Sequence, residues 1–286
     1  MGIVKPLIEL AERDAAAQHR IFFLRVRRRI FVGQSQINGA SRRDGIVDPG
    51  MLLGELHTIR GGENGLTMQL VPLSSADRRS AFEAALNFET SELEFPFGLL
   101  DADRRELVPS PRCWEEASEH PQLFDPREEH LRVFTRRIIP TLKLPRHAVV
   151  FDPACSTGTF LASIGEAFPE LRLYGADVSP RMVDVARTIL KQVELATPGN
   201  VDRMIIGSDV LVLRFLNAEV VRSETAESLF RQFAELLPSK SYMLVMGYTP
   251  VAISIPYLAS HCGMSIIRSI GGWGDTIFQY YVLRKR

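Results

Sequence analysis

The stretch AVVFDPACSTGTFL, at residues 148–161, constrains the fold of this chain more than any other segment. An apolar run ends at Asp152, the chain turns on small residues, and a helix begins. A second apolar run, RLYGAD, ends at another carboxylate, Asp177. In a parallel α/β sheet, backbone N–H groups at such a turn approach a nucleoside ligand, and the second carboxylate accepts hydrogen bonds from the ribose hydroxyls. The segment therefore predicts a nucleoside-binding α/β sheet.

The turn itself resembles motif I of the class I S-adenosylmethionine (SAM)-dependent methyltransferases. The family pattern D/E-x-G-x-G-x-G becomes DPACSTG in this chain, so Ala154 and Ser156 replace two of the three glycines. The resemblance implies SAM as the cofactor and gives a set of expected cofactor-binding residues. These are Asp152, Ala154, Cys155, Ser156, Gly158, Asp177, Val178, Met182, Ser208 and Asp209.

Apolar runs alternate with helical patterns from about residue 125 onward, which favours a parallel sheet with helices on both faces. The resemblance implies a Rossmann-like, mostly parallel sheet of seven strands that closes with a C-terminal antiparallel hairpin. We place the third strand at VDRMIIG (201–207), after a helix over 180–195, and the hairpin at 264–272 and 276–285. We divide the chain into a SAM-binding domain at 125–286 and a substrate-binding cap at 1–124.

The cap is expected to be mainly helical. Residues 6–31 show apolar side chains at helical spacing, and GIVDPGMLLGEL (45–56) is expected to be helical as well. Residues 74–90 begin with a Ser or Asp cap and continue as an amphipathic helix. The basic run at 25–29 fits either a solvated helix face or a phosphate-binding patch.

Several candidate site residues have two readings. Asp177 can bind the ribose, or the segment can supply the N-cap of the following helix through Asp177 or Ser179. Cys155 can be a nucleophile or a buried apolar thiol. Asp209 can contact the adenine amino group or stand at the start of the next strand. The remaining residues follow expected strands as acceptor-pocket candidates, with a solvated loop as the other reading for the first three: Arg214, Asn217, Glu219 and Tyr248.

Composition limits the range of partners. Lys+Arg and Asp+Glu both number 34, so nothing in the overall charge favours a nucleic-acid partner. The six histidines are scattered and the three cysteines are far apart, which predicts no metal site and a reducing, cytoplasmic environment. No signal-peptide pattern or membrane span is recognised. We expect a small-molecule substrate, and the sequence leaves homodimer formation open.

The resemblance implies a SAM-dependent methyltransferase that acts on a small molecule, in secondary metabolism by analogy with the superfamily. Transfer by direct displacement needs alignment of the reacting atoms and no shared catalytic residue. The alternative is attack on the Cγ carbon of the aminobutyrate arm of SAM, either transferring that arm or cyclising it as azetidine-2-carboxylate synthases do, with release of methylthioadenosine. A third reading is a non-enzymatic scaffold that retains the fold.

Overall fold

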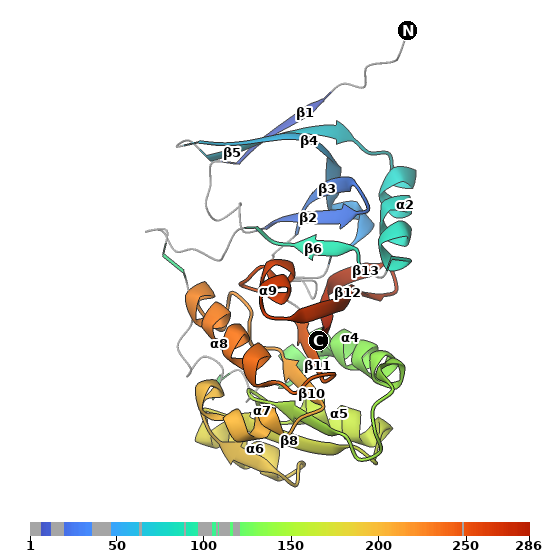
Figure 1. The fold of residues 1–286 in the computed structure, drawn as a ribbon. Coiled ribbons are helices and arrows are strands. Elements are labelled where there is room, and N and C mark those ends of the chain that lie inside the picture. The colour runs from blue at the N-terminus through green and yellow to red at the C-terminus, as the bar shows by residue number, and fades with distance from the viewer. Residues whose placement is uncertain are drawn as a thin grey trace.

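The computed structural model describes residues 7–12, 20–35, 47–62, 65–88, 90–96, 105–106, 108, 115–116, 121–247 and 249–286. These residues form two sheets, one antiparallel and one mostly parallel, which lie one above the other in Figure 1. Helices cover both faces of the mostly parallel sheet.

The mostly parallel sheet has seven strands in the order β12-β13-β11-β10-β7-β8-β9. β13 is antiparallel to both of its neighbours, whereas the pairs among β7 to β11 are parallel. This order, with a reversed strand inserted next to the edge, confirms the expected class I methyltransferase fold and its C-terminal hairpin. The strands are β7 Val149–Asp152, β8 Arg172–Asp177, β9 Val193–Leu195, β10 Val210–Leu213, β11 Tyr242–Met246, β12 Met264–Trp273 and β13 Thr276–Lys285.

Two hydrophobic clusters hold the helices against this sheet. One face carries α4, α5 and α6, and the other carries α7, α8 and α9. Strand residues alternate between the clusters, as Val210 and Leu211 do, because successive side chains of a strand point to opposite faces. The helices are α4 Pro121–Ile138, α5 Thr159–Ala167, α6 Pro180–Arg187, α7 Asp202–Ile206, α8 Ser223–Leu236 and α9 Ile255–His261, with short 3-10 turns η2 Ile139–Leu142 and η3 Pro198–Asn200.

The order of the strands reverses between β7 and β10. From β7 the chain moves outward to β8 and β9, and then returns to place β10 on the other side of β7. Ligands of open α/β sheets bind at the carboxyl ends of the strands at such a switch point. The fold therefore places the end of β7 and the loop after β10 at the centre of the site.

The expectation of a mainly helical N-terminal cap is wrong. The first described elements form a six-stranded antiparallel sheet in the order β1-β5-β4-β3-β2-β6, with one described α-helix, α2 Ser75–Leu86, which confirms the helix expected within 74–90. A second expected helix, at 45–56, is replaced by the 3-10 turn η1 Pro49–Met51 and the start of β4. The strands are β1 Ile8–Glu12, β2 Ile21–Val26, β3 Arg29–Gln34, β4 Leu52–Gly62, β5 Gly65–Pro72 and β6 Glu92–Glu94.

The error has a local cause in the run of arginines. The apolar residues of IFFLRVRRRIFV fit a helix, but the chain reverses at Arg27, whose φ of 56° closes a tight hairpin between β2 and β3. Arg25 then pairs with Glu92 and Arg29 with Glu55, both on neighbouring strands. β-branched and aromatic side chains favour strands, and pairing across the sheet outweighs the helical spacing. The basic run is a hairpin with ion-paired arginines, not a helix face.

The third parallel strand is also misplaced in the sequence prediction. The helix expected over 180–195 ends at Arg187, and VEL (193–195) forms β9 by pairing with β8. The segment expected to be this strand contains α7 instead. Short apolar runs do not distinguish a strand from a helix. Here residues 193–195 become the strand because they pair with the edge of β8 that β7 leaves open.

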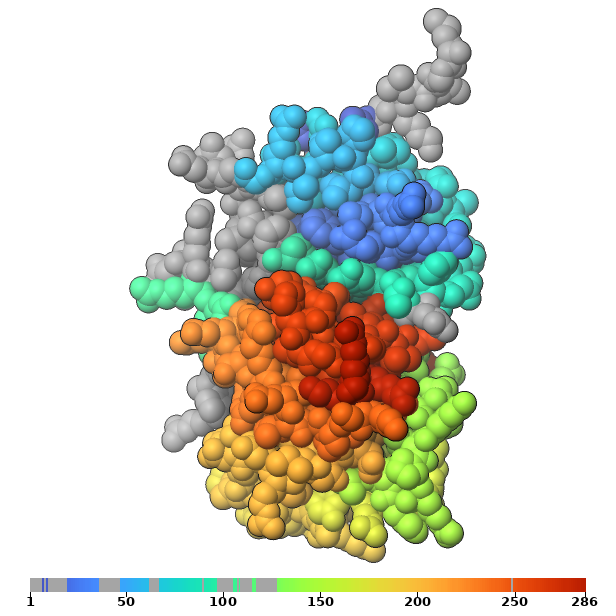
Figure 2. Space-filling model, viewed as in Figure 1, coloured from blue at the N-terminus to red at the C-terminus, as the bar shows by residue number. Residues whose placement is uncertain are grey.

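The two sheets share a core through the hairpin of β12 and β13. Ile270 and Ile277 from this hairpin are fully buried among residues of β2, β4 and α2. Gln279 and Tyr281 donate side-chain hydrogen bonds to the carbonyl of Leu93 on β6. In Figure 2 the red C-terminal segments lie directly against the green-cyan segment around residue 93. The division at residue 124/125 stays a prediction, and the last strands of the chain contribute to the N-terminal core.

Candidate functional site

The turn after β7 is built around backbone conformations that small residues allow. Ser156 and Gly158 have φ angles of 53° and 80°, in the left-handed region, and Gly158 is the N-cap of α5. A Cβ on Gly158 would lie 2.8 Å from Cδ1 of Leu190, so a side chain there would displace Leu190 and would also be strained by the positive φ. The amide of Ala154 donates to Oδ1 of Asp152 over 3.0 Å, which closes the turn. The sequence motif thus folds into the tight turn that it predicts.

Asp177 connects this turn to the next one. Its Oδ2 accepts a hydrogen bond of 2.8 Å from the amide of Ser156, and its Oδ1 accepts one of 2.9 Å from the amide of Ser179. The N-cap of α6 is Ser179, whose hydroxyl accepts from the amide of Met182. A carboxylate has about four acceptor positions, so both oxygens of Asp177 retain capacity for ribose hydroxyls. Asp177 therefore holds the two loops together, and a ligand role is compatible with that.

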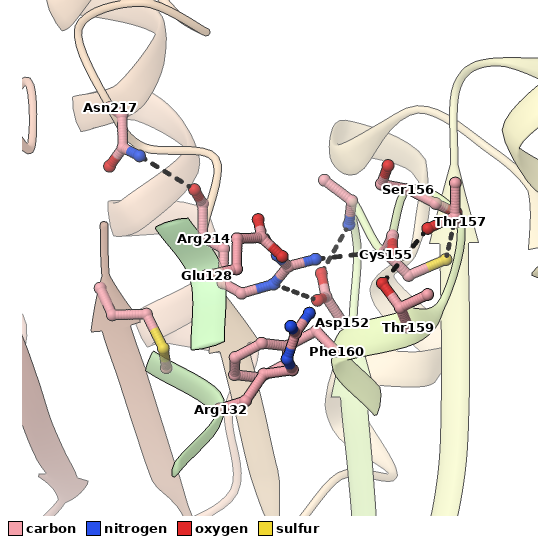
Figure 3. A network of polar contacts seen from close by, with 12 residues as sticks. Glu128, Arg132, Asp152, Cys155, Ser156, Thr157, Thr159, Phe160, Arg214 and Asn217 are labelled. Carbon is pink, nitrogen blue, oxygen red and sulfur yellow. Dashed lines mark hydrogen bonds and ion pairs between the residues drawn. The ribbon is translucent and has the colours of Figure 1, made fainter. Parts of the chain in front are cut away.

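An ion network occupies the switch point between β7 and β10. Arg214 donates from Nε to Oδ2 of Asp152 at 3.1 Å and from Nη1 to Oε1 of Glu128 at 2.9 Å. Its Nη2 lies 3.5 Å from the carbonyl oxygen of Cys155, and its guanidinium stacks 4.5 Å from the centre of the Phe160 ring. Figure 3 shows Arg214 between the two carboxylates, with Phe160 beneath it. Three elements, α4, β7 and the loop after β10, meet in this network.

Burial makes the network strongly interdependent. Asp152 is fully buried, and burial raises the pKa of its carboxyl group, while the charge of Arg214 opposes that rise. Burial also disfavours the charge of Arg214, but Glu128 and Asp152 outweigh this effect and raise the pKa of the guanidinium. Each charge is therefore maintained at this depth by the opposite charge beside it.

Cys155 is a packing residue in this arrangement. Its side chain is 1% exposed and packs against Gly175. The contact is close, because a Cβ added to Gly175 would lie only 2.7 Å from the sulfur of Cys155. Burial, followed by the charges of Asp152 and Asp177, raises the pKa of the thiol well above its usual range. Because the thiolate is the nucleophilic form, this environment favours the buried-thiol reading over the nucleophile reading.

Ser208 and Asp209 lie at the wrong edge of the sheet for a cofactor site. Asp209 precedes β10, and its Oδ2 accepts from the amide of Val149 at the start of β7. The hydroxyl of Ser208 donates to the carbonyl of Ile205. In a parallel sheet the amino ends of the strands share one edge, opposite the edge where Asp152 and Asp177 end their strands. The expected adenine contact of Asp209 is therefore wrong, and its strand-edge reading holds.

The acceptor-pocket candidates have different surroundings. Asn217 is buried, donates from Nδ2 to the carbonyl of Arg214, and has no hydrogen-bond partner for Oδ1 among the described residues. Glu219 is half-buried in the same loop, two positions further on. Tyr248 lies outside the described residues. Asn217 and Arg214 are thus brought together, and the solvated-loop reading fails for both because they are buried.

Two further cofactor candidates differ in exposure. Val178 is 53% exposed beside Asp177, so its side chain is available to a ligand. Met182 is buried, and its sulfur lies 3.6 Å from the hydroxyl of Ser156. Met182 therefore contacts the turn after β7 from α6. Ala154, within the turn, packs against the hydrophobic cluster that contains α7, α8 and α9.

Sequence reasoning missed two acidic residues. Glu128 contacts Arg214 from α4, and Glu115 accepts a hydrogen bond of 2.7 Å from the hydroxyl of Ser179. Both lie far along the chain from their partners, so no motif spacing reveals them. The available signal was Arg214 itself, because an arginine that directly follows a buried strand requires acidic partners.

No group of three His, Cys, Asp or Glu side chains is placed to hold a metal ion in the ranges that the structure describes. In the same part of the chain, no helix is long and apolar enough to cross a membrane.

Comparison with known proteins gives one related enzyme. No family model matches the chain. The chain is 33% identical over 245 residues to isonocardicin synthase of Nocardia uniformis subsp. tsuyamanensis, and the match covers 84% of this chain and 79% of that enzyme.

Solved structures similar to this chain include methyltransferases at low identity. A putative O-methyltransferase from Nostoc punctiforme PCC 73102 matches with a TM-score of 0.49 and 16% identity, covering 65% of this chain and 64% of its own. The plantazolicin methyltransferase BpumL, solved with S-adenosylhomocysteine (SAH), matches with a TM-score of 0.47 and 15% identity, covering 62% and 92%. The sheet has the strand order expected for a class I methyltransferase fold. The long match to one enzyme shows that this chain belongs to the family of isonocardicin synthase.

Proposed function

We propose that this protein transfers the 3-amino-3-carboxypropyl arm of SAM to a small-molecule acceptor and releases methylthioadenosine. The observation that carries the proposal is the similarity to isonocardicin synthase, an enzyme named for the compound that it makes and not for a methylation. The 245 matched residues cannot all lie within 125–286, so the similarity extends into the N-terminal region. That region is the one that we expect to select the acceptor.

SAM supplies a sulfonium whose attached carbons are electrophilic. In the proposed reaction the acceptor's lone pair forms a bond to Cγ of the arm, the S–Cγ bond breaks, and its electron pair stays on sulfur. The acceptor loses a proton, and methylthioadenosine is the neutral thioether product. The contribution of the protein is alignment, because such a displacement requires the nucleophile, carbon and sulfur to be in line at near-attack distance.

For the nucleoside, we propose that the two loops joined by Asp177 form the binding site. The carboxylate of Asp177 is placed to accept from the ribose hydroxyls while it holds the amides of Ser156 and Ser179. The left-handed turn at Ser156 and Gly158 lets the backbone approach the ligand closely. Val178, exposed beside Asp177, supplies an apolar surface for the adenine.

Methyl transfer to a small molecule is the second candidate. It is favoured by the strand order, including the reversed β13, which is the arrangement of class I methyltransferases. Cyclisation of SAM is a variant of the first candidate, in which the amino group of the arm itself attacks Cγ and no acceptor is needed. The three reactions differ in their products, which makes them separable.

A product analysis with labelled SAM tests the proposal. The protein is incubated with SAM labelled either in the methyl group or in the arm, alone and with nucleophilic small molecules such as phenols. Mass spectrometry should find methylthioadenosine, with the arm label on the acceptor. SAH together with the methyl label on the acceptor would establish methyl transfer instead, and methylthioadenosine formed without any acceptor would establish cyclisation.

A further inference from the structure

The Glu128–Arg214–Asp152 network lies where the amino-acid arm of SAM has to reach. The ribose is expected at Asp177, at the end of β8, and the switch point between β7 and β10 is the next position along the carboxyl edge of the sheet. Arg214 and Asp152 occupy that position, and Glu128 approaches it from α4. A cofactor bound across this edge therefore brings its arm to the network (Figure 3).

The charges of the network and of SAM are complementary. Two carboxylates and one guanidinium leave the network with one net negative charge. SAM carries a sulfonium, an ammonium and a carboxylate, which together leave one net positive charge. Opposite charges in a site of low dielectric attract strongly, so binding of the complete cofactor neutralises the site.

The three residues differ in what they can offer to a ligand. Asp152 is fully buried, so a ligand has no access to its carboxylate, which accepts from the amide of Ala154 and from Arg214. The guanidinium of Arg214 has five N–H donors, of which the contacts in the described part of the chain use three. The side chain of Glu128 is 22% exposed, and its Oε1 is the oxygen bound to Arg214. Arg214 can thus donate to an anion, and Glu128 can accept from a cation.

We propose that Arg214 and Glu128 form a subsite that recognises the amino-acid arm itself, with Arg214 binding its carboxylate and Glu128 its ammonium. Asp152 is a positioning residue that fixes Arg214 through the Nε contact. The subsite makes the protein selective for nucleosides that carry the complete arm. This inference rests on the proposed function only in its use of SAM as the donor, because either transfer reaction requires the arm to be held.

The subsite also separates substrate from product in the proposed reaction. After arm transfer, methylthioadenosine keeps only the nucleoside contacts and has nothing to offer Arg214 or Glu128. After methyl transfer, SAH would keep the whole arm and remain bound through it. Selectivity against methylthioadenosine would therefore help an arm-transferring enzyme to release its nucleoside product.

Binding of three nucleosides to the whole chain tests this subsite. SAH carries the complete arm, decarboxylated SAH lacks the carboxylate, and methylthioadenosine lacks both charged groups. Their affinities are measured by calorimetry for the unaltered protein, Glu128→Gln and Arg214→Lys, with Asp177→Asn as the control. Circular dichroism and a thermal melt establish that each variant is folded.

The expected pattern is specific to each change. Glu128→Gln should weaken SAH and decarboxylated SAH by about tenfold or more, as for loss of a hydrogen bond to a charged group, and leave methylthioadenosine within about twofold. Arg214→Lys should weaken SAH alone, because only SAH carries the carboxylate. Asp177→Asn should weaken all three nucleosides to a similar degree.

The inference is overturned if Glu128→Gln weakens SAH and methylthioadenosine equally, or leaves SAH binding unchanged. Should Arg214→Lys not fold, Glu128→Gln decides alone, because the side chain of Glu128 is partly exposed and its substitution is nearly isosteric. Failure of the proposed reaction gives a different result. In that case the labelled products contain SAH, while the affinity pattern of the three nucleosides is unaffected.

Discussion

The Nε of Arg214 donates to Oδ2 of Asp152 over 3.1 Å, joining two residues that are 62 positions apart in the sequence. Asp152 ends β7 and Arg214 follows β10, so the bond spans the point where the order of the parallel strands reverses. Both groups are buried. The carboxyl edge of the parallel strands therefore contains a buried ion pair on which the stability of that edge depends.

Replacing Arg214 by methionine should strongly destabilise the protein. The change leaves the fully buried Asp152 without its cation, which typically costs about 3–5 kcal/mol of unfolding free energy. Urea denaturation measures the difference. Arg231→Met is the matched control, because Arg231 and Glu227 form an exposed pair on α8 for which a loss below about 1 kcal/mol is expected.

The same variant should gain stability on acidification. Burial already raises the pKa of Asp152, and removal of Arg214 removes the charge that opposes the rise. A carboxyl group with a higher pKa in the folded than in the unfolded state binds its proton preferentially when folded, so its stabilising contribution is lost as pH rises through the folded pKa. The loss of unfolding free energy that Arg214→Met causes, measured against the unaltered protein, should therefore be smaller at a pH of about 5 than at about 7. An unchanged difference would contradict this account of Asp152.

Replacing Asp177 by alanine should reduce the affinity for SAM. Loss of the carboxylate removes the proposed ribose contacts and frees the amides of Ser156 and Ser179, and we expect a weakening of about 1–3 kcal/mol. Calorimetric titration with SAH measures it. Asp184→Ala on α6 is the control, since its side chain is 77% exposed, and equal affinities for the two variants would place the ribose elsewhere.

His130 should make the protein less stable in mild acid. Its imidazole is 5% exposed, packs edge-on against Phe278, and has a pKa lowered from 6.5 to about 4, first by burial and then by Arg132. A lowered folded pKa means that the unfolded chain binds the proton more readily, so this stability is lost as pH falls from about 6.5 through about 4. The upper bound is roughly 3 kcal/mol, from the size of the shift.

The variant His130→Phe isolates that contribution. Its unfolding free energy, followed by urea denaturation across the acid range, should vary less with pH than that of the unaltered protein. Parallel pH profiles for the two proteins would show that His130 is protonated in the folded state as readily as in the unfolded one.

Replacing Gly158 by alanine should destabilise the turn after β7. The φ of 80° disfavours any side chain by roughly 1–2 kcal/mol, and the new methyl group would lie 2.8 Å from Leu190. The change should lower both the melting temperature and the affinity for SAM, because the turn shapes the site. Gly199→Ala is the control, since no heavy atom lies within 4 Å of the Cβ position there, and it should be nearly neutral.

Local patterns in the sequence were sufficient to predict the tight turn after β7. The succession of apolar strand, acidic residue and small residues places Asp152 and Asp177 at the ends of adjacent strands, and the structure has β7 and β8 end there. Turn chemistry and strand ends are set by residues close together in the chain, so they are readable without the fold. The C-terminal hairpin of β12 and β13 is predictable for the same reason.

The tertiary structure decided which long-range partners complete the site. Glu128 reaches Arg214 only because α4 packs beside α5, and Asp209 is placed at the far edge only because the strands run parallel. The N-terminal sheet likewise depends on pairing between strands, whose apolar spacing also fits a helix. The sequence by itself determined the turn after β7 and the order of most core elements, because these follow from contacts between near neighbours. The fold decided how the strands pair, at which edge of the sheet each residue lies, and which buried charges are paired. Each of these depends on residues that only folding brings together.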